Sequence, residues 1–347
     1  AMSGGKFIVT THAPGELVLH LGEVDAAPLL RLRGHHMLER QWYGVGFALD
    51  LDAGRAELFQ QAKTRYPCID DSGTAQARCS GDSVQLGIAF TLAGAPQVMG
   101  PNAHQGAQRV EHHFNGKIDS PALLRGWHGA QRQPELLLKK ALPETQALRL
   151  AQWDFSREIP SRRAVDVSDH GHHGELHQAP ARAMKGWNWS GRCHDWTSNA
   201  EEYGAIHFHD DDLYDAQWAP SLHLQLPKDL PSGAYALRIS QGPNTALLTR
   251  ESYIPFFVRP PTRPAHVAGR RKRIAFLAPT VSYVAYANHR AHIDGQEVER
   301  NMGKLLEFGH ADVVLHDNPQ LAGSLYDKHR DGSGRCHSSR LRPVLNF

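Results

Sequence analysis

The sequence predicts a mixed fold: a β-sandwich, a smaller β unit, and then the start of an α/β domain with a parallel sheet. Three patterns lead to this prediction. Short runs of alternating apolar and polar residues, separated by glycine-containing turns, fill residues 1 to about 125. A second alternating stretch lies between residues 181 and 262. Residues 271–347 begin with a continuous apolar run and continue with a segment of helical period, which is typical of α/β proteins.

The bulk composition is that of an ordinary globular protein and excludes several classes. The chain has 347 residues, a net charge of +2, and 41% hydrophobic and 21% charged residues. These values give no strong field to attract nucleic acid or a membrane surface, and no apolar run reaches the ~18 residues of a membrane span. The four cysteines include no CxxC pair. Free thiols in a reducing cytoplasm are therefore favoured, although Cys68 and Cys79 could bridge a loop. Both ends run directly into apolar segments, so we expect an internal fragment of a longer protein.

Residues 45–60 give the clearest local prediction, a β-hairpin. Apolar residues alternate from Val45 to Leu51, Asp52-Ala53-Gly54 supplies a turn, and residues 56–60 return as the partner strand. Further along, Val84 to Leu92 predicts another strand.

Two motifs indicate the kind of sandwich. The run FNGKID at residues 114–119 resembles a strand-turn of concanavalin- and laminin-G-like lectin domains, in which Asn-Gly makes a tight turn. WDF at 153–155, followed by the Asp-Val-Ser of 166–168, is similar to an edge of the same sandwich. We therefore expect a lectin-like antiparallel sandwich over residues 1–180, with Phe114 and Trp153 inside it, and a helix within it near residues 134–140.

The rest of the chain divides into two parts. Residues 181–262 form the small β unit, with alternating leucines at 222, 224 and 226 and a second alternation from Tyr235 to Ile239. Prolines then mark a stiff linker. In residues 271–347, Ile274–Leu277 suits a buried strand, residues 296–308 a helix, and Ala311–Leu315 a second strand.

The abundant histidines raise the question of a metal. His207 and His209 project from one face of a predicted strand, with Asp210 next in sequence, a geometry that suits a divalent ion. No further ligand is evident nearby in the sequence. We therefore predict that these three residues bind no catalytic metal, and that they lie away from the loops considered next.

Two polar loops follow the predicted strands of the α/β segment. The first holds Tyr283, Tyr286, Asn288, His289 and Arg290, and the second spans residues 324–334. Ligands of open α/β sheets bind beyond the carboxyl ends of the strands, so we expect the two loops to meet at a site. The sequence contains no G-x-S-x-G, P-loop, dinucleotide or HExxH motif.

The motifs IAFLAPTVSYVAYANHR (274–290), SLYDKHRDGSG (324–334) and SSRLRP (338–343) resemble the large, or beta, subunit of the N,N-dimethylformamidase family. GWNW at 186–189 and EEYGAIHFHDDDLYDA at 201–216 fit the same family. The resemblance implies a glutamine-amidotransferase-like α/β domain and a mononuclear non-haem iron bound by two tyrosines and one glutamate. By motif, the tyrosines would be Tyr286 and Tyr326, with Tyr283 as the rival for the first position. The carboxylate ligand and the general base would lie beyond Phe347.

The expected function is therefore that of a fragment of an iron-dependent amidohydrolase, which hydrolyses N,N-dimethylformamide or a similar small amide to acid and amine. The family resemblance also implies a small helical partner subunit and a homo-oligomer of the resulting heterodimer. The truncated chain alone is expected to be inactive. The alternative is a non-catalytic carbohydrate- or surface-binding β-sandwich protein.

Overall fold

The structure is a computed structural model of the chain. It describes residues 2–4, 7–12, 15–21, 28–63, 71–79, 90–96, 110–111, 113–128, 146–241, 250–260, 275–289, 303, 309–318, 321 and 323–345. The chain forms two compact units, one made of residues 1–217 with 280–347 and the other of residues 218–279. Among the described residues, no helix is long and apolar enough to cross a membrane.

Two antiparallel sheets at the N-terminal end share one apolar core. The first has the order β4-β3-β2-β1-β8 and the second the order β5-β6-β7. Their strands are β1 (Met2–Gly4), β2 (Phe7–His12), β3 (Glu16–Leu21), β4 (Leu30–His36), β5 (Tyr43–Asp50), β6 (Arg55–Ala62), β7 (Gly73–Arg78) and β8 (Phe90–Leu92). Leu17, Leu19, Leu30 and Leu32 of the first sheet pack with Ala56 and Leu58 of the second. Burying alternate side chains of both sheets in this way is what makes a β-sandwich-like body.

The predicted hairpin is confirmed. β5 and β6 pair in register from Tyr43–Ala62 to Asp50–Arg55. In the turn, the Asp50 carboxylate accepts a hydrogen bond from the Ala53 N–H at 3.0 Å. Gly54 has a φ of +62°, which glycine adopts without strain. The strand predicted at residues 84–92 is described only at Phe90–Leu92, where it forms β8.

A second group of antiparallel strands surrounds the predicted motifs. β12, β13, β14 and β15 form one sheet, β11, β17 and β16 another, and β9 with β10 a short pair. These strands are β9 (Ala95–Pro96), β10 (Val110–Glu111), β11 (Gly116–Asp119), β12 (Ala122–Leu124), β13 (Arg149–Asp154), β14 (Arg163–Asp166), β15 (Gly174–Glu175), β16 (Ala181–Met184) and β17 (Ala205–Phe208). A short 3-10 helix, η3 (Ala200–Tyr203), leads into β17.

Trp153 is buried in a second apolar core with Phe155 and Ile206 and stacks on Phe90 of β8, as expected of an interior residue. Phe114 is only half-buried. The expected boundary at residue 180 falls inside the β11-β17-β16 sheet, because β11 pairs with β17. The lectin-like character of the body stays a prediction, and the helix expected at 134–140 lies outside the described residues.

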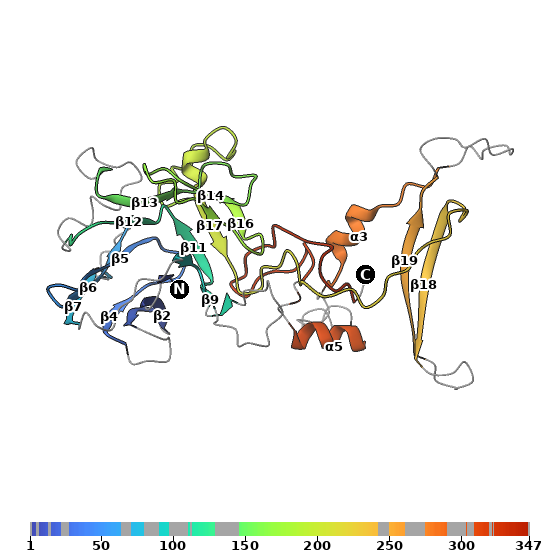
Figure 1. Cartoon of the computed structure of the whole chain (residues 1–347), viewed down its shortest axis with the longest axis horizontal. Coiled ribbons are helices and arrows are strands. Elements are labelled where there is room, and N and C mark those ends of the chain that lie inside the picture. The colour runs from blue at the N-terminus through green and yellow to red at the C-terminus, as the bar shows by residue number, and fades with distance from the viewer. Residues whose placement is uncertain are drawn as a thin grey trace. The chain divides into compact units, whose positions relative to one another are not determined.

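Among its described residues, the unit of residues 218–279 contains one long hairpin, β18 (Gly233–Gln241) paired with β19 (Arg250–Val258) (Figure 1). The strand expected around Leu222, Leu224 and Leu226 was wrong, since residues 222–227 pair with no strand and the three leucines are exposed. Alternating apolar residues form the buried face of a strand only when another layer of the protein packs on them. Among the described residues, no layer packs on these leucines.

The α/β expectation for the C-terminal part is not seen in the described residues. Residues 275–279 form no strand, and Phe276 and Leu277 are strongly exposed. The second predicted strand was also wrong, because His310–Asp317 form a helix, α5. The Asp312 carboxylate accepts the Gly309 N–H at 2.9 Å, and this N-terminal cap outweighs the strand preference of Val313-Val314. The helix expected at 296–308 lies outside the described residues apart from Gly303.

Candidate functional site: a tyrosine pair

Tyr286 and Tyr326 lie against each other, as the sequence predicted. Tyr286 is the last residue of helix α3 (Thr280–Tyr286), and Tyr326 lies in the turn Ser324–Asp327. The two rings stack with centroids 4.3 Å apart and an interplanar angle of 25°. Both are about half exposed, at 48% and 57%. The phenols therefore form a paired surface open on one side.

The two hydroxyls also interact. A hydrogen bond with Tyr286 is the main cause that raises the pKa of Tyr326 above its ordinary value. Tyr326 therefore releases its proton less readily than an ordinary tyrosine does. Tyr283, the rival candidate, lies one turn earlier in α3, and it is Tyr286 whose ring stacks on Tyr326.

The C-terminal end of α3 is held by partners from distant parts of the chain. A helix leaves its last four carbonyls without partners inside the helix. Here the Leu325 N–H donates to the Ala285 carbonyl at 2.9 Å, which ties the Tyr326 turn directly to α3. The Ser338 hydroxyl donates to the Val284 carbonyl at 3.0 Å. Backbone capping thus fixes the two tyrosines relative to each other.

Arg342 is the centre of this arrangement. Its buried guanidinium donates to the Gly323 carbonyl at 2.6 Å and to the Ala287 carbonyl at 3.0 Å, one on each side of the tyrosine pair. It also donates to the Ser338 hydroxyl at 2.7 Å. A cation at a helix C-terminus is favourable because the carbonyl ends carry partial negative charge.

Asn288 ends the helix. Its φ of +63° is a left-handed conformation that asparagine tolerates better than most residues and that is common just after a helix. Its fully buried side chain donates to the Pro343 carbonyl at 2.8 Å and accepts the Leu345 N–H at 2.9 Å. The same side chain therefore anchors residues 343–345 beneath the site.

The Tyr326 turn has its own local hydrogen bonds. The Ser324 hydroxyl oxygen accepts the Tyr326 N–H at 3.0 Å and lies 2.9 Å from Nδ1 of His289. The Asp327 carboxylate accepts the Ser324 N–H at 2.7 Å. His289 also stands edge-on to the Tyr326 ring. The expectation that the two loops meet is confirmed, since the Leu325 N–H donates to the Ala285 carbonyl. The first loop is largely the helix α3, however, and the residues described just before each loop form no strand.

A second polar cluster lies where the sequence analysis expected none. The rings of His207 and His209 on and just after β17 have centroids 4.0 Å apart, so they share one face as predicted. His207 Nε2 lies 2.8 Å from the Asp331 carboxylate, and the His329 ring stacks on His209 at 3.6 Å. Both reasons for discounting this site were wrong, because further ligand types are nearby and they come from the second loop. That it binds no catalytic metal stays a prediction.

Buried ion pairs hold this cluster. The Asp211 carboxylate accepts from His329 Nδ1 and from Arg335, each at 2.5 Å. Burial alone would raise the pKa of Asp211, but these partners outweigh it and lower the pKa to about 2. Burial lowers the pKa of His207 to about 4. Asp210 points elsewhere and pairs with exposed Arg330 at 2.9 Å.

Sequence reasoning missed Arg342, Asp211, His329 and Asp331 as organisers of these sites. Two signals were available: SSRLRP was noticed only as a family motif, and the loop 324–334 as a polar loop and a family motif whose assigned ligand was Tyr326. Neither could be assigned a partner, because each pairs with residues more than fifty positions away.

Comparison with known proteins identifies a family that the chain resembles. Residues 181–347 match the family described as N,N-dimethylformamidase beta subunit-like, C-terminal. The chain is 33% identical to the N,N-dimethylformamidase beta subunit of Paracoccus aminophilus and 31% identical to that of Alcaligenes sp, over 96% of its own length in both cases. It spans 43% of the length of each relative.

These similarities make the chain a relative of proteins named for the hydrolysis of an amide. The relatives are N,N-dimethylformamidase beta subunits. The tyrosine pair lies in the part that matches the family.

Proposed function

We propose that this chain is part of a larger subunit of an amidohydrolase, which hydrolyses N,N-dimethylformamide or a similar small amide to acid and amine. The observation that carries the proposal is the stacked, half-exposed pair of Tyr286 and Tyr326, found in a chain whose relatives are named for that reaction. The chain spans 43% of those relatives, so the rest of the site would come from the remainder of the subunit.

The donor set fits a mononuclear, non-haem ferric iron. Phenolate oxygens are hard anionic ligands, and a bound cation lowers the pKa of a phenol enough to ionise it. That effect would overcome the raised pKa of Tyr326. Bound iron would supply Lewis acidity toward the amide carbonyl.

The other residues of the site would orient the ligands. Arg342 and Asn288 hold the backbone on both sides of the pair, so the two hydroxyls stay together without support from the iron. The exposed side of the pair leaves room for a third ligand and for substrate. We assign the third ligand, a carboxylate, and the general base to residues beyond Phe347.

In the proposed assembly, the subunit pairs with a small helical partner subunit, and the resulting heterodimer forms a homo-oligomer. We place this assembly in the cytoplasm. The name of the relatives, beta subunit, implies a second kind of subunit in those enzymes. A carbohydrate- or surface-binding sandwich is the less favoured function, because the family match covers the tyrosine pair and not only the β body.

Iron binding tests the proposal. In a subunit extended to the length of the relatives, we expect stoichiometric iron, a visible tyrosinate-to-iron charge-transfer band and amide hydrolysis. Tyr286→Phe and Tyr326→Phe should each abolish the band and the activity, since phenylalanine keeps the ring but not the oxygen. The 347-residue chain should bind iron more weakly, because two ligands form an incomplete shell.

Tyr283→Phe is the matched control, one helical turn from Tyr286 in α3, and should keep band and activity. If it loses both while Tyr286→Phe keeps them, the first ligand is Tyr283. If all three variants keep the band, the tyrosine site is wrong. A folded subunit with neither iron nor the charge-transfer band would instead favour the non-catalytic, carbohydrate- or surface-binding β-sandwich protein.

A further inference from the structure

Three hydrogen-bond acceptors converge in the polar cluster at the end of β17. They are Nδ1 of His209, Nε2 of His329 and Oδ1 of Asp212. These atoms all lie within 4.8 Å of one another. The Asp212 oxygen is 3.3 Å from the His209 nitrogen and 4.0 Å from the His329 nitrogen.

The hydrogen bonds of His329 determine which of its nitrogens carries a lone pair. Nδ1 lies 2.5 Å from the Asp211 carboxylate, which can only accept, so the proton is on Nδ1. Arg335 holds the other oxygen of Asp211. Nε2, on the side of Asp212, is therefore the nitrogen that a metal ion would bind. Histidine ligands of metal ions are typically held in this way by a carboxylate on the other nitrogen.

His209 is oriented by the same logic. The Ser333 hydroxyl donates its one proton to Asp331 at 2.6 Å, so its oxygen can only accept from His209 Nε2, 3.1 Å away. This places a proton on Nε2, so Nδ1, which lies 3.3 Å from the Asp212 carboxylate, is the nitrogen that an ion would bind. Asp212 is oriented as well, since its other carboxylate oxygen accepts the His209 backbone N–H at 2.9 Å.

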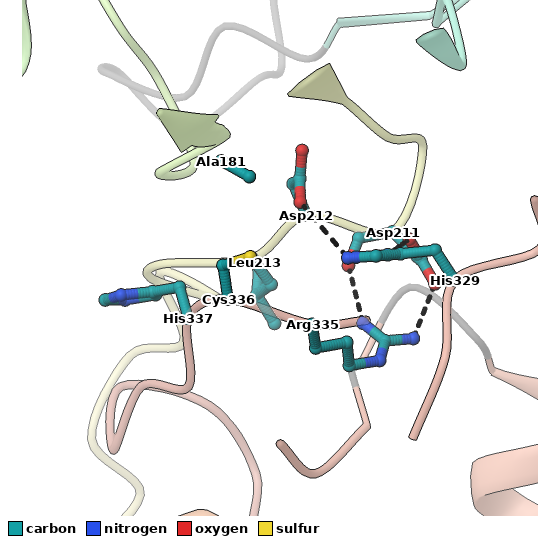
Figure 2. A pocket seen from close by; sticks show the side chains of 8 residues that line it. All are labelled: Ala181, Asp211, Asp212, Leu213, His329, Arg335, Cys336 and His337. Carbon is teal, nitrogen blue, oxygen red and sulfur yellow. Dashed lines mark hydrogen bonds and ion pairs between the residues drawn. The ribbon is translucent and has the colours of Figure 1, made fainter. Parts of the chain in front are cut away.

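Two imidazole nitrogens thus lie near one carboxylate oxygen, a set of ligand atoms that suits a cation. The two rings are parallel, with centroids 3.6 Å apart, so they have to tilt for both nitrogens to bind the same ion. Beside them is a cavity of about 10 Å³, roughly the space of one water-sized occupant. Figure 2 shows Asp212, His329, Cys336 and His337 around this pocket. The ring of His209 is almost fully buried, as is that of His329.

We propose that His209, Asp212 and His329 bind a divalent transition-metal ion, with Zn²⁺ as the best match. Two imidazoles and a carboxylate suit zinc, and a closed, buried site suits a structural ion. Cys336, an exposed residue on the wall of the cavity, is the candidate for a fourth ligand. The ion would clamp the loop 328–336 onto the end of β17. Because His329 lies three residues after Tyr326, it would also steady the tyrosine turn.

The neighbouring set of His207, His209 and Asp331 is the weaker choice. There the proton of His207 Nε2 satisfies the Asp331 carboxylate at 2.8 Å, and His209 Nε2 is satisfied by Ser333. His207 is therefore a matched control: it is an imidazole of the same cluster that the proposal leaves out of the site.

The test is zinc binding by the purified chain, stripped with chelator and then studied by equilibrium dialysis and elemental analysis. We expect one Zn²⁺ per chain and a rise in melting temperature with zinc, since an ion that binds only the folded state stabilises it. Asp212→Asn and His329→Gln should weaken binding at least about tenfold. His207→Gln and the double variant Tyr286→Phe/Tyr326→Phe should bind as the parent chain does.

Cobalt substitution decides the matter if a variant fails to fold. Co²⁺ in the parent chain should give the visible spectrum of a tetrahedral site with nitrogen and oxygen ligands. A thiolate-to-cobalt band that disappears in Cys336→Ser would identify the fourth ligand. If the folded parent chain binds neither ion, the proposal is wrong. A second proton on the ring of His209 or His329 then supplies the positive charge beside Asp212. Equal zinc binding by all variants would overturn it too. Neither result bears on iron at the tyrosine pair.

Discussion

The β body and the C-terminal segment of residues 280–345 are organised by different forces. The body is held by side chains such as Leu19 and Leu58, which are fully buried between two sheets. In the C-terminal segment the fully buried side chains include Asn288, Ser324 and Leu315, only one of them apolar. There the backbone is held by hydrogen bonds from Arg342, Asn288 and Asp327. An apolar core tolerates imprecise packing, whereas a polar network has to satisfy each group.

This difference explains where the candidate site lies. Both polar clusters involve the segment that hydrogen bonds organise, and they use its rigid, directional contacts to position tyrosine and histidine side chains. The comparison predicts that a single polar deletion disrupts the C-terminal segment locally, while an apolar deletion weakens the body as a whole.

The largest effect is expected from Arg342→Met. Methionine keeps most of the apolar stem but leaves the carbonyls of Ala287 and Gly323 without their charged donor. Hydrogen bonds to charged groups contribute about 1.5–3 kcal/mol each, so the local cost of losing two should be about 3–6 kcal/mol. Hydrogen–deuterium exchange should rise in residues 283–289 and 323–327 while β5 and β6 stay protected. The control is Arg340→Met, at an exposed position two residues away, which should leave hydrogen–deuterium exchange unchanged in both regions. Uniform loss of protection would contradict the comparison.

Leu58→Ala should weaken the body. Leu58 is fully buried in the core between the two N-terminal sheets, and such truncations cost roughly 3 kcal/mol through lost burial and the cavity left behind. Chemical denaturation measures the loss. The control is Leu38→Ala, at a position that is 37% exposed, where little change is expected. A cost below about 1 kcal/mol at Leu58 would mean that these two sheets do not share a core.

Asp166 is a polar residue inside the β body that fixes the backbone through hydrogen bonds, as the polar network of the C-terminal segment does. Its buried carboxylate accepts the N–H groups of Gln152 at 2.8 Å, Ser168 at 2.9 Å and His172 at 2.7 Å. Burial raises its pKa, but these donors outweigh burial and lower the pKa below the ordinary 3.8. The stability that Asp166 contributes is therefore complete above that value and is lost as the pH falls through the folded-state pKa.

Asp166→Asn should cost about 1–3 kcal/mol at neutral pH, because an amide group meets donors where the carboxylate accepted them. It should also flatten the fall in stability below about pH 4. Asp154→Asn is the control, since that carboxylate caps a more exposed turn and should matter less. Denaturation curves at several pH values measure both. An unchanged pH dependence in Asp166→Asn would show that other carboxyl groups dominate acid unfolding.

The sequence predicted the parts of the fold that depend on periodicity. The hairpin of β5 and β6 follows from the alternation at Val45–Leu51 and a glycine turn, both local signals. The strands expected at Ile274–Leu277 and Ala311–Leu315 depend on neighbours in a sheet, and the described residues provide none. Asp312 then capped a helix where Val313-Val314 suggested a strand.

The tyrosine pair was predictable only because its motifs resemble a known family, while the residues that hold it were not. Arg342 reaches Ala287 across 55 positions, and Asp211 reaches His329 across 118. Contacts at such separations leave no periodic trace in one sequence. The histidine cluster was discounted for the same reason, since His329 and Asp331 lie far from His207 and His209 in the chain.

Anomalous diffraction from crystals of the subunit extended to the relatives' length, grown with iron, tests the central claim most directly. At the iron edge, we expect one peak about 2 Å from the hydroxyl oxygens of both Tyr286 and Tyr326, the usual length of a metal–oxygen bond. At the zinc edge, any peak should lie at His209 and His329, separate from the first. An iron peak at the histidine cluster, or one that touches neither tyrosine, would contradict the account.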